Sequence, residues 1–392
     1  MTTIERRMIQ LARRFSNFPT YPLADVPQIK RDLIAQGVDV IDLGAGDADL
    51  APPPAAVAAL RDAAGQPHMS RYPFQLGLPA FREAVSTWMR KRFNVQLDPY
   101  RQVLPLVGSK EGIAHIAFAY AGPGDVTILP DPGYLPYLGG TLLAGGEPHA
   151  VPLRPETDFL IPFEDVPPAV ARRTRIVYLN YPNNPTTAIA PLSYLADAVD
   201  FCRRNGAILV YDNAYSEIAF DGYRPPSIFE VDGAMDVAVE FHSFSKTYNM
   251  TGWRIGWAAG GADAIAALSR VKSFVDTGQF LPVQAAAAAA LGAYDDWVPG
   301  NVRAFRDRRD ALAAALCESG IEAIAPAATM YLWVPVPAGA SEPFARRALM
   351  EQGVVIMPGA ALGAGGEGFF RCALTQPPDR LREAARRLAQ LV

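Results

Sequence analysis

Cysteine, histidine and long apolar runs are scarce in this sequence. The 392 residues include three cysteines, with no C-x-x-C pair, and four histidines that lie far apart without an H-E-x-x-H motif. The longest apolar runs, such as residues 285–292, fall well short of the roughly 20 residues that a membrane helix requires. We therefore expect no disulfide framework, no metal site, no membrane span and a reducing, cytoplasmic environment.

Lysine is also rare. Only five of the 36 basic residues are lysines, at positions 30, 91, 110, 246 and 272, and the net charge is −4. A slightly acidic chain is a poor partner for nucleic acid or an acidic membrane. The arginine-rich N-terminus lacks the apolar segment of a secretory signal, which leaves an exposed helix or arm, or an organellar presequence. Because lysines are so few, each can be examined individually.

The distribution of apolar runs predicts an α/β fold. From about residue 100 to 260, short apolar segments alternate with helical spacing, which indicates a mainly parallel sheet covered on both faces. We predict strands at 126–129, 175–180, 207–211, 237–242 and 254–258, and helices at 109–121 and 192–205.

The last third of the chain predicts a smaller α/β unit. Its expected helices are an alanine-rich one near 285–293 and a charged one at 302–319, and its expected strands are 330–334, 354–357 and 369–374. The length fits two domains. We assign residues 45–285 to a large domain, and residues 1–44 plus 286–392 to a small domain.

One lysine stands in an unusual setting. The segment 241–256 reads F-H-S-F-S-K-T-Y-N-M-T-G-W-R-I-G, so Lys246 follows an apolar strand and has aromatic neighbours. Burial among aromatic side chains lowers the pKa of a lysine and makes its amine a nucleophile, although a solvated turn lysine is the simpler alternative. Ser243 and Arg254 add a hydroxyl and a planar cation, which together suit a phosphate.

This segment resembles the fold-type-I aminotransferases that depend on pyridoxal 5'-phosphate. The resemblance extends over nearly the whole chain, through D-P-G-Y at 131–134 and L-N-Y-P-N-N-P at 179–185. It is strongest to the branch typified by LL-diaminopimelate aminotransferase. The fold class that the resemblance implies is a large domain with a mainly parallel sheet, plus a smaller α/β domain.

The resemblance implies roles around the cofactor ring. Lys246 would bind the cofactor covalently and then move a proton, and Asp212 would hold the pyridine nitrogen protonated. Asn184 and Tyr215 would bond the ring's phenolic oxygen, and Tyr134 would stack on the ring. Capping by Asp212, or a ligand-free buried position for either tyrosine, is the structural alternative.

The resemblance also assigns the phosphate and the substrate. Ser243 and Arg254 would bind the phosphate together with the start of the helix at 109, where free N–H groups attract an anion. There the residues are Gly108, Ser109 and Lys110, and we expect the amine of Lys110 to be exposed.

Three further residues extend this assignment. Arg371 would take the substrate carboxylate as a bidentate pair, aided by Gly46 and Asn184. An arginine inside an apolar strand needs an anion. Tyr72 would reach the phosphate of a partner subunit, which implies a homodimer.

The sequence departs from this branch at positions that bear on the substrate. Thr187 replaces the usual glycine, which requires other backbone angles or strain. Gln75 and Leu76 stand where diaminopimelate enzymes tend to place a glutamate near the distal amine, and this puts diaminopimelate as substrate in doubt.

The sequence therefore predicts a ping-pong aminotransferase that acts on an L-amino acid and a 2-oxo acid. A β-eliminating lyase on the same fold is the alternative, and a non-enzymatic sensor is a weaker one. Lys30, Lys91 and Lys272 are predicted to be surface charges.

Overall fold

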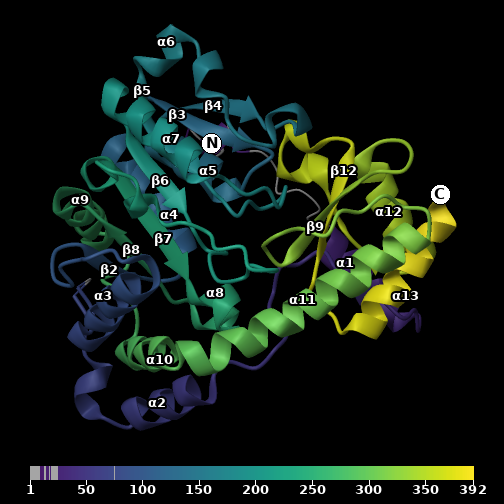
Figure 1. Cartoon of the computed structure of the whole chain (residues 1–392), viewed down its shortest axis with the longest axis horizontal. Helices are drawn as coiled ribbons and strands as arrows, with labels where there is room; N and C mark the ends of the chain where they lie inside the picture. Colours follow the sequence, from purple (N-terminus) through teal and green to yellow (C-terminus); the bar gives the residue numbers. More distant parts are fainter. Residues whose placement is uncertain (1–8, 13–14, 17, 19–24, 75) are drawn as a thin grey trace, which may run out of the picture.

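A computed structural model describes residues 9–12, 15–16, 18, 25–74 and 76–392. Gln75 and the four N-terminal arginines, at positions 6, 7, 13 and 14, therefore lie outside the described residues. Figure 1 shows one large sheet with its helices, a smaller group of strands and helices beside it, and the long helix α11 running along both.

The large sheet has seven strands in the order β2-β8-β7-β6-β5-β3-β4. The five strands from β7 to β4 are parallel, whereas β8 pairs antiparallel with both β7 and β2. In chain order the strands are β2 (Val103–Leu106), β3 (Val126–Asp131), β4 (Glu147–Pro152), β5 (Thr174–Leu179), β6 (Ile208–Asp212), β7 (Ala238–Ser243) and β8 (Gly256–Gly260).

Both faces of this sheet are buried, as the continuous apolar strands predict. Alternate residues point to opposite faces, so Ile176 packs with one group of helices and Val177 with the other. The first group is α4 (Ser109–Tyr120), α5 (Leu135–Ala144) and α9 (Ala262–Ser273). The second is α3 (Pro79–Phe93), α7 (Leu192–Asn205) and α10 (Leu281–Gly292), with α2 (Pro54–Ala64) packed on α10.

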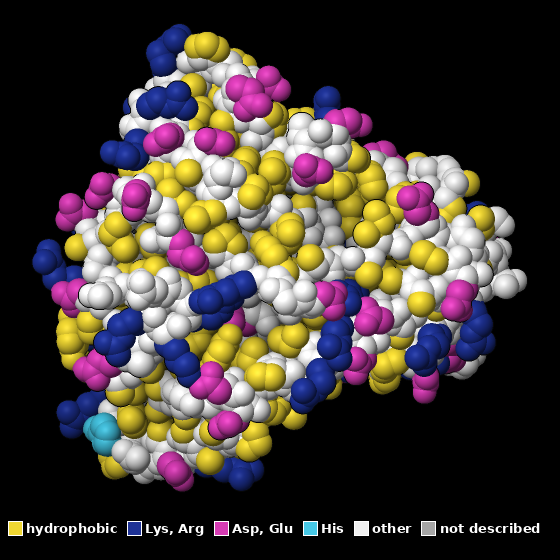
Figure 2. All heavy atoms as spheres, in the orientation of Figure 1, with side chains coloured by type: hydrophobic (Ala, Val, Ile, Leu, Met, Phe, Trp, Pro, Cys, Tyr) yellow, Lys and Arg dark blue, Asp and Glu magenta, His cyan; other side chains and the backbone are white. Residues whose placement is uncertain are grey.

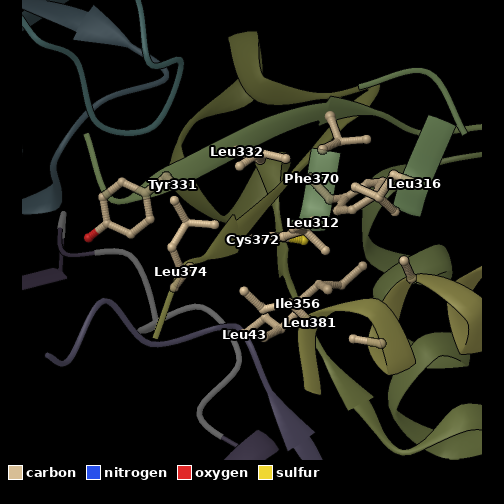
Figure 3. Packing of buried hydrophobic residues seen from close by; sticks show 14 of the residues in the cluster. Leu43, Leu312, Leu316, Tyr331, Leu332, Ile356, Phe370, Cys372, Leu374 and Leu381 are labelled. Carbon is tan, nitrogen blue, oxygen red and sulfur yellow. The ribbon is translucent and has the colours of Figure 1, made fainter. Parts of the chain in front are cut away.

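The smaller unit is built on the antiparallel sheet β11-β12-β9 and the parallel pair β1-β10. Its core includes Leu43, Leu316, Phe370 and Leu381, which pack together as Figure 3 shows. The strands are β1 (Ile41–Asp42), β9 (Tyr331–Pro335), β10 (Val354–Val355), β11 (Met357–Pro358) and β12 (Phe369–Ala373). The helices are α1 (Val26–Ala35), α11 (Tyr294–Glu318), α12 (Ser341–Gln352) and α13 (Pro378–Leu388).

Most predicted elements are found close to their expected bounds. The run 354–357 is an exception, because Val354–Val355 pairs with β1 whereas Met357–Pro358 pairs with β12. Helix α11 begins at Tyr294, eight residues before the predicted start at 302, and Pro299 lies inside it. The predicted boundary at 285/286 falls within α10, whose partners are α2 and α3.

The predictions on cysteine and membrane segments can be compared directly with the fold. Cys202, Cys317 and Cys372 are all free thiols. No helix in the described part of the chain is long and apolar enough to cross a membrane. Acidic and basic side chains are interspersed on the face in Figure 2, which fits the near balance of charge.

Two short helices complete the path of the chain. Helix α6 (Pro168–Ala171) precedes β5, and α8 (Phe244–Thr247) follows β7 directly. Because β6 and β7 are neighbouring parallel strands, their carboxyl ends bring Asp212 and α8 to the same edge of the sheet. Ligand sites in open α/β sheets lie at this edge.

Candidate active site

A cavity of about 360 Å³ lies at this edge and is bounded by residues of both sheets. Except for Gly108 and Tyr72, every residue predicted to serve the site lines it. These residues are Gly46, Ser109, Lys110, Tyr134, Asn184, Asp212, Tyr215, Ser243, Lys246, Arg254 and Arg371. Residues that are far apart in the sequence therefore meet as predicted.

Lys246 reaches the cavity from α8. Ser243 caps this helix by accepting a hydrogen bond from the Ser245 N–H at 3.2 Å, which aims the helix away from the end of β7. Phe244 and Tyr248 are buried on either side. The Lys246 Nζ donates to the carbonyl of Gly46, so the amine is held at the cavity wall and not in solvent.

Asp212 ends β6 and is buried. Its Oδ2 accepts a hydrogen bond from Tyr137 at 2.9 Å, whereas its buried Oδ1 has no partner. Burial raises the pKa of this carboxyl to about 6, against the lowering effect of the Tyr137 hydrogen bond. A buried carboxylate oxygen that has no protein partner can accept a hydrogen bond from a donor group of a ligand in the cavity.

An anion-binding corner is formed by the start of α4 and the segment before β8. Gly108 has φ 75°, and a Cβ there would lie 2.5 Å from the guanidinium Nη2 of Arg254. A side chain at this position would displace the Arg254 guanidinium from the loop, and the positive φ also favours glycine. Arg254 Nη1 donates to the Thr251 carbonyl at 2.9 Å, and the side chain of Lys110 is exposed as expected.

Arg371 occupies the opposite side of the cavity, on β12. Its Nη1 donates to Asn184 Oδ1 at 2.7 Å and its Nη2 to the Gly44 carbonyl at 2.9 Å. The guanidinium also stacks on Tyr331, 4.2 Å from the ring centroid. Among the described residues Arg371 forms no ion pair, and its buried Nε is unpartnered. A buried cation with neutral partners favours an incoming carboxylate.

Two tyrosines connect these groups. The hydroxyls of Tyr215 and Tyr331 are 3.2 Å apart. Burial raises the pKa of both, but the charges of Lys246 and Arg371 bring the pKa of Tyr331 below its usual value. A Cβ on Gly46 would overlap the Tyr331 hydroxyl. The backbone at this position can therefore lie against Tyr331 because the residue is glycine.

Tyr134 and Tyr72 lie in different environments. Tyr134 lines the cavity and meets Tyr137 edge-to-face at 5.7 Å. Tyr72 lies outside the cavity with 73% of its surface exposed. Its predicted contact with a partner subunit stays a prediction.

Sequence reasoning missed Tyr137, Tyr331 and Asn180. Tyr137 lies one helical turn beyond Tyr134, which is a signal that could have identified it. Asn180 donates to the Asp212 carbonyl at 2.7 Å and accepts from the Asn184 N–H at 2.7 Å, so it joins the two loops. Tyr331 follows Met330 in an apolar strand, and no local signal separates it from a core residue.

Two further predictions concern a charge and the backbone, and the structure contradicts the first. Lys272 is fully buried, so the prediction of a surface charge is wrong there; Glu111 and Asp276 surround its ammonium. Thr187 adopts φ 62°, a conformation that β-branched residues rarely take. The strain predicted for a threonine at this glycine position is therefore present.

Comparison with known proteins identifies the family. The model of the family "Aminotransferase class I and II" matches residues 38–388. An LL-diaminopimelate aminotransferase of Desulforudis audaxviator is 50% identical over 96% of each chain. The chain therefore belongs to the class I and II aminotransferases, and it is an enzyme that transfers amino groups.

Solved structures agree on the fold. Substrate-bound BacF of Bacillus subtilis superposes with a TM-score of 0.93 at 32% identity over 98% of both chains. A probable N-succinyldiaminopimelate aminotransferase of Thermus thermophilus gives a TM-score of 0.89 at 38% identity, covering 94% of this chain and 99% of that one. The predicted fold class, fold type I, is confirmed.

Proposed function

We propose that the protein is an aminotransferase that uses pyridoxal 5'-phosphate to move an amino group from an L-amino acid to a 2-oxo acid in two half-reactions. The observation that carries this proposal is the convergence of Lys246, Asp212 and Arg371 on one cavity. These groups supply an amine, an acid with a free oxygen and an unpaired cation. The fully paired side chains of an ordinary core would not be arranged in this way.

The residues present fit this cofactor. The unpartnered Oδ1 of Asp212 would accept the protonated ring nitrogen, and Tyr134 would cover the ring. Arg254, Ser243 and the N-terminus of α4 would bind the phosphate. Once bound, the protonated ring supplies an electron sink for charge that develops at the substrate Cα.

The protein's own groups then orient and deprotonate the substrate. Arg371 would hold the α-carboxylate with two parallel hydrogen bonds, which fixes the direction of the Cα–H bond. Lys246, released from the carbonyl of Gly46, would take that proton from the Cα. In the second half-reaction it would return a proton to the Cα of the product amino acid. Tyr331 lies between Arg371 and Tyr215 and keeps the guanidinium in place.

LL-diaminopimelate is the first donor to test. Relatives at 44–50% identity over nearly the whole chain carry that name, although Gln75 replaces the acid expected near the distal amine. We propose LL-diaminopimelate as the amino donor and 2-oxoglutarate as the acceptor. We also propose a homodimer in which Tyr72 completes the site of the partner subunit, and a cytoplasmic location. The proposed domains are residues 45–285 and residues 1–44 plus 286–392.

The test is a single half-reaction. Protein loaded with cofactor and mixed with LL-diaminopimelate alone should release one oxo acid per site and lose the absorption of the aldehyde form. Lys246→Ala should fail to do so, while Lys91→Ala, at an exposed site, should behave as the parent protein.

Other donors separate the remaining possibilities. Aspartate, glutamate, alanine and aromatic amino acids serve as competing donors in the same assay. Release of ammonia and pyruvate from a β-substituted donor, without transfer, would replace transamination by elimination.

A further inference from the structure

Lys272 is the buried lysine that the active site does not use. It lies on α9, its side chain has no solvent exposure, and its ammonium contacts two carboxylates. Glu111 Oε2 is 2.8 Å away, and both oxygens of Asp276 are 3.1 Å away. Burying an ammonium costs several kcal/mol unless it is paired. A lysine so completely enclosed therefore has a structural task.

One side of this cluster holds the start of α4. Glu111 lies in the first turn of that helix and accepts a hydrogen bond from the Val107 N–H at 3.1 Å. Its other oxygen bonds His115 at 2.8 Å. Burial alone would raise the pKa of Glu111, but His115 and Lys272 bring it below its usual value, so the carboxylate is charged. The loop that leads into Gly108 is thereby tied to Lys272.

The other side holds the backbone of Arg254. Asp276 accepts from the Gly278 N–H at 2.7 Å, which shapes the turn before Gln279. The Gln279 side-chain amide donates to the carbonyls of Trp253, at 2.9 Å, and Arg254. Arg254 has φ 53°, an unfavourable conformation for a residue with a side chain. Gln279 offsets that cost by binding the two carbonyls next to the bend.

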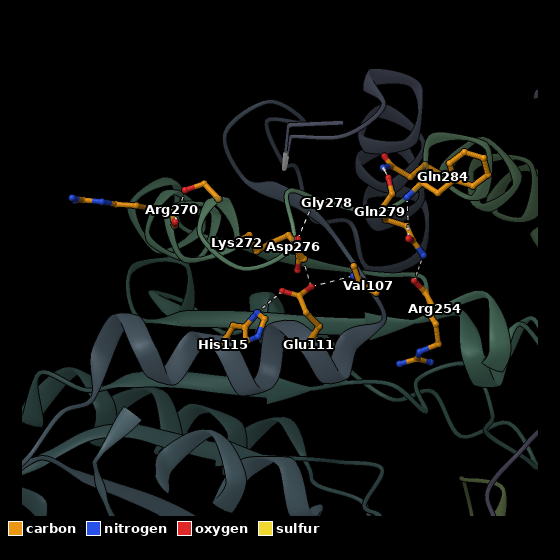
Figure 4. Close-up of polar contacts among 12 residues, drawn as sticks. Val107, Glu111, His115, Arg254, Arg270, Lys272, Asp276, Gly278, Gln279 and Gln284 are labelled. Carbon is orange, nitrogen blue, oxygen red and sulfur yellow. Dashed lines mark hydrogen bonds and ion pairs between the residues drawn. The ribbon is translucent and has the colours of Figure 1, made fainter. Parts of the chain in front are cut away.

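These contacts form a ring that connects the two sides of the proposed phosphate site. Figure 4 shows Val107, Glu111, Lys272, Asp276, Gly278, Gln279 and Arg254 joined in sequence. The ring closes where Arg254 packs on Gly108. The ring thus connects the two halves of the anion-binding corner, and the buried ammonium joins its two carboxylates, Glu111 and Asp276.

The same carboxylates do not form a metal site. Glu111, His115 and Asp276 present ligand atoms within 4.8 Å of one another, which is close enough for a cation. The Lys272 ammonium already bonds both carboxylates, so it takes the place that a metal ion would occupy.

From this ring we propose that Lys272 is a positioning residue for the cofactor phosphate. By holding Glu111 and Asp276 together, it sets the spacing between the N-terminus of α4 and the guanidinium of Arg254. Lys272 does not touch the phosphate itself. The inference rests on the proposed cofactor and predicts a defect confined to phosphate recognition.

The experiment compares two ligands on the cofactor-free protein. Affinities for pyridoxal 5'-phosphate and for pyridoxal, which lacks the phosphate, are measured by absorbance titration for the parent, Glu111→Gln, Lys272→Met and Gln279→Ala. Groups that hold metal ligands in place change metal affinity by roughly 10- to 100-fold when they are mutated, and we take the lower end of that range for the phosphate site. We expect roughly tenfold weaker binding of the phosphorylated ligand, with pyridoxal within about twofold of the parent.

Controls separate positioning from folding and from the proposed function. Lys91→Met removes an exposed ion pair with Asp295 and should leave both affinities unchanged. Glu111→Gln and Gln279→Ala leave no unpaired buried charge, so they decide the question if Lys272→Met does not fold. Equal losses for both ligands, or none, would overturn the inference, whereas a parent protein that binds neither ligand would overturn the proposed function.

Discussion

Asp212 and Arg371 are buried ionisable residues that each keep a polar atom without a protein partner. Each atom belongs to a group that ordinary packing would have neutralised or paired. The two unpartnered atoms suit different ligand groups, because the Asp212 oxygen accepts hydrogen bonds and the Arg371 nitrogen donates them. At this scale the site is defined by what is unpaired as much as by what is bonded.

The raised pKa of Asp212 predicts a pH-dependent stability of the cofactor-free protein. Folding raises the pKa of this carboxyl from 3.8 to about 6, so the native state binds the proton more tightly than the unfolded chain does. Stability is therefore lost as pH rises from about 4 through about 6. Asp212→Asn cannot ionise, so its stability relative to the parent should be higher at pH 8 than at pH 4, by up to about 3 kcal/mol.

Urea unfolding of the cofactor-free proteins at both pH values measures this difference. Asp379→Asn, at an exposed site, is the matched control and should show no such change. A pH-independent difference between Asp212→Asn and the parent would contradict a raised native pKa.

Arg371 predicts a defect in substrate use without a defect in cofactor binding. Arg371→Gln removes the charged fork, and hydrogen bonds to charged groups are worth about 1.5–3 kcal/mol each. We expect kcat/KM to fall roughly 100-fold for amino acids. Arg371→Lys keeps the charge without the fork and should recover only part of the loss.

Two further measurements show whether this defect is specific. Cofactor affinity should stay near the parent value in both Arg371 variants. Arg346→Gln changes an exposed arginine and should retain parental kinetics. Full activity of Arg371→Gln would contradict the proposal that Arg371 binds the substrate carboxylate.

At the scale of elements, apolar periodicity predicted the central strands well but not the edge. Strands β3, β5, β6 and β7 are continuous apolar runs because both of their faces are covered. Strand β4 reads E-P-H-A-V-P and lies at the edge, where prolines and exposed residues hide the pattern. The first eight residues of α11 were missed because Pro299 lies within them.

The site was more predictable than its support. Lys246, Asp212 and Arg254 stand in local motifs, so sequence context alone selected them. Lys272 owes its burial to Glu111, 161 positions away, and nothing near it in the sequence reports that contact. Tyr331 is likewise defined by Arg371 and Tyr215, which only the fold brings to it.

The loop that begins α4 predicts a difference between two glycines. Gly108 and Gly124 both have positive φ, but a Cβ meets Arg254 at Gly108 and open space at Gly124. Both alanine substitutions should cost stability through backbone strain, by about 1–3 kcal/mol at Gly108, whose ψ is 155°. Only Gly108→Ala should also weaken binding of pyridoxal 5'-phosphate, as measured by titration of the cofactor-free proteins. Equal affinities for the two variants would show that Arg254 does not need this close approach.

At the scale of the whole molecule, exposed apolar side chains predict self-association. Tyr72, Phe74, Leu76, Phe274 and Phe280 are largely exposed. Gln284 links the two segments that carry them, since it bonds the Leu78 N–H and the Gln279 carbonyl, each at 2.7 Å. Patches of this kind mark interfaces, so light scattering should give twice the monomer mass.

A charge placed in this surface should separate the subunits. Phe274→Asp should shift the mass toward the monomer and reduce transamination, because Tyr72 would lose its partner site. Leu143→Asp changes another exposed apolar residue, on α5, and should leave the mass unchanged. A monomeric parent with full activity would contradict the shared site.

The contrasting positions of the five lysines have a chemical consequence. Lys91 and Lys110 are exposed and Lys30 is partly so, whereas Lys246 faces a cavity and Lys272 is enclosed. Amine-directed acylation of the folded protein will therefore distinguish three classes of lysine in a single digest. A lysine-specific protease does not cut after an acylated lysine, so each of the five lysines reports its own labelling through the presence or absence of one cleavage. The rarity of the residue turns labelling chemistry into a direct map of cavity, core and surface.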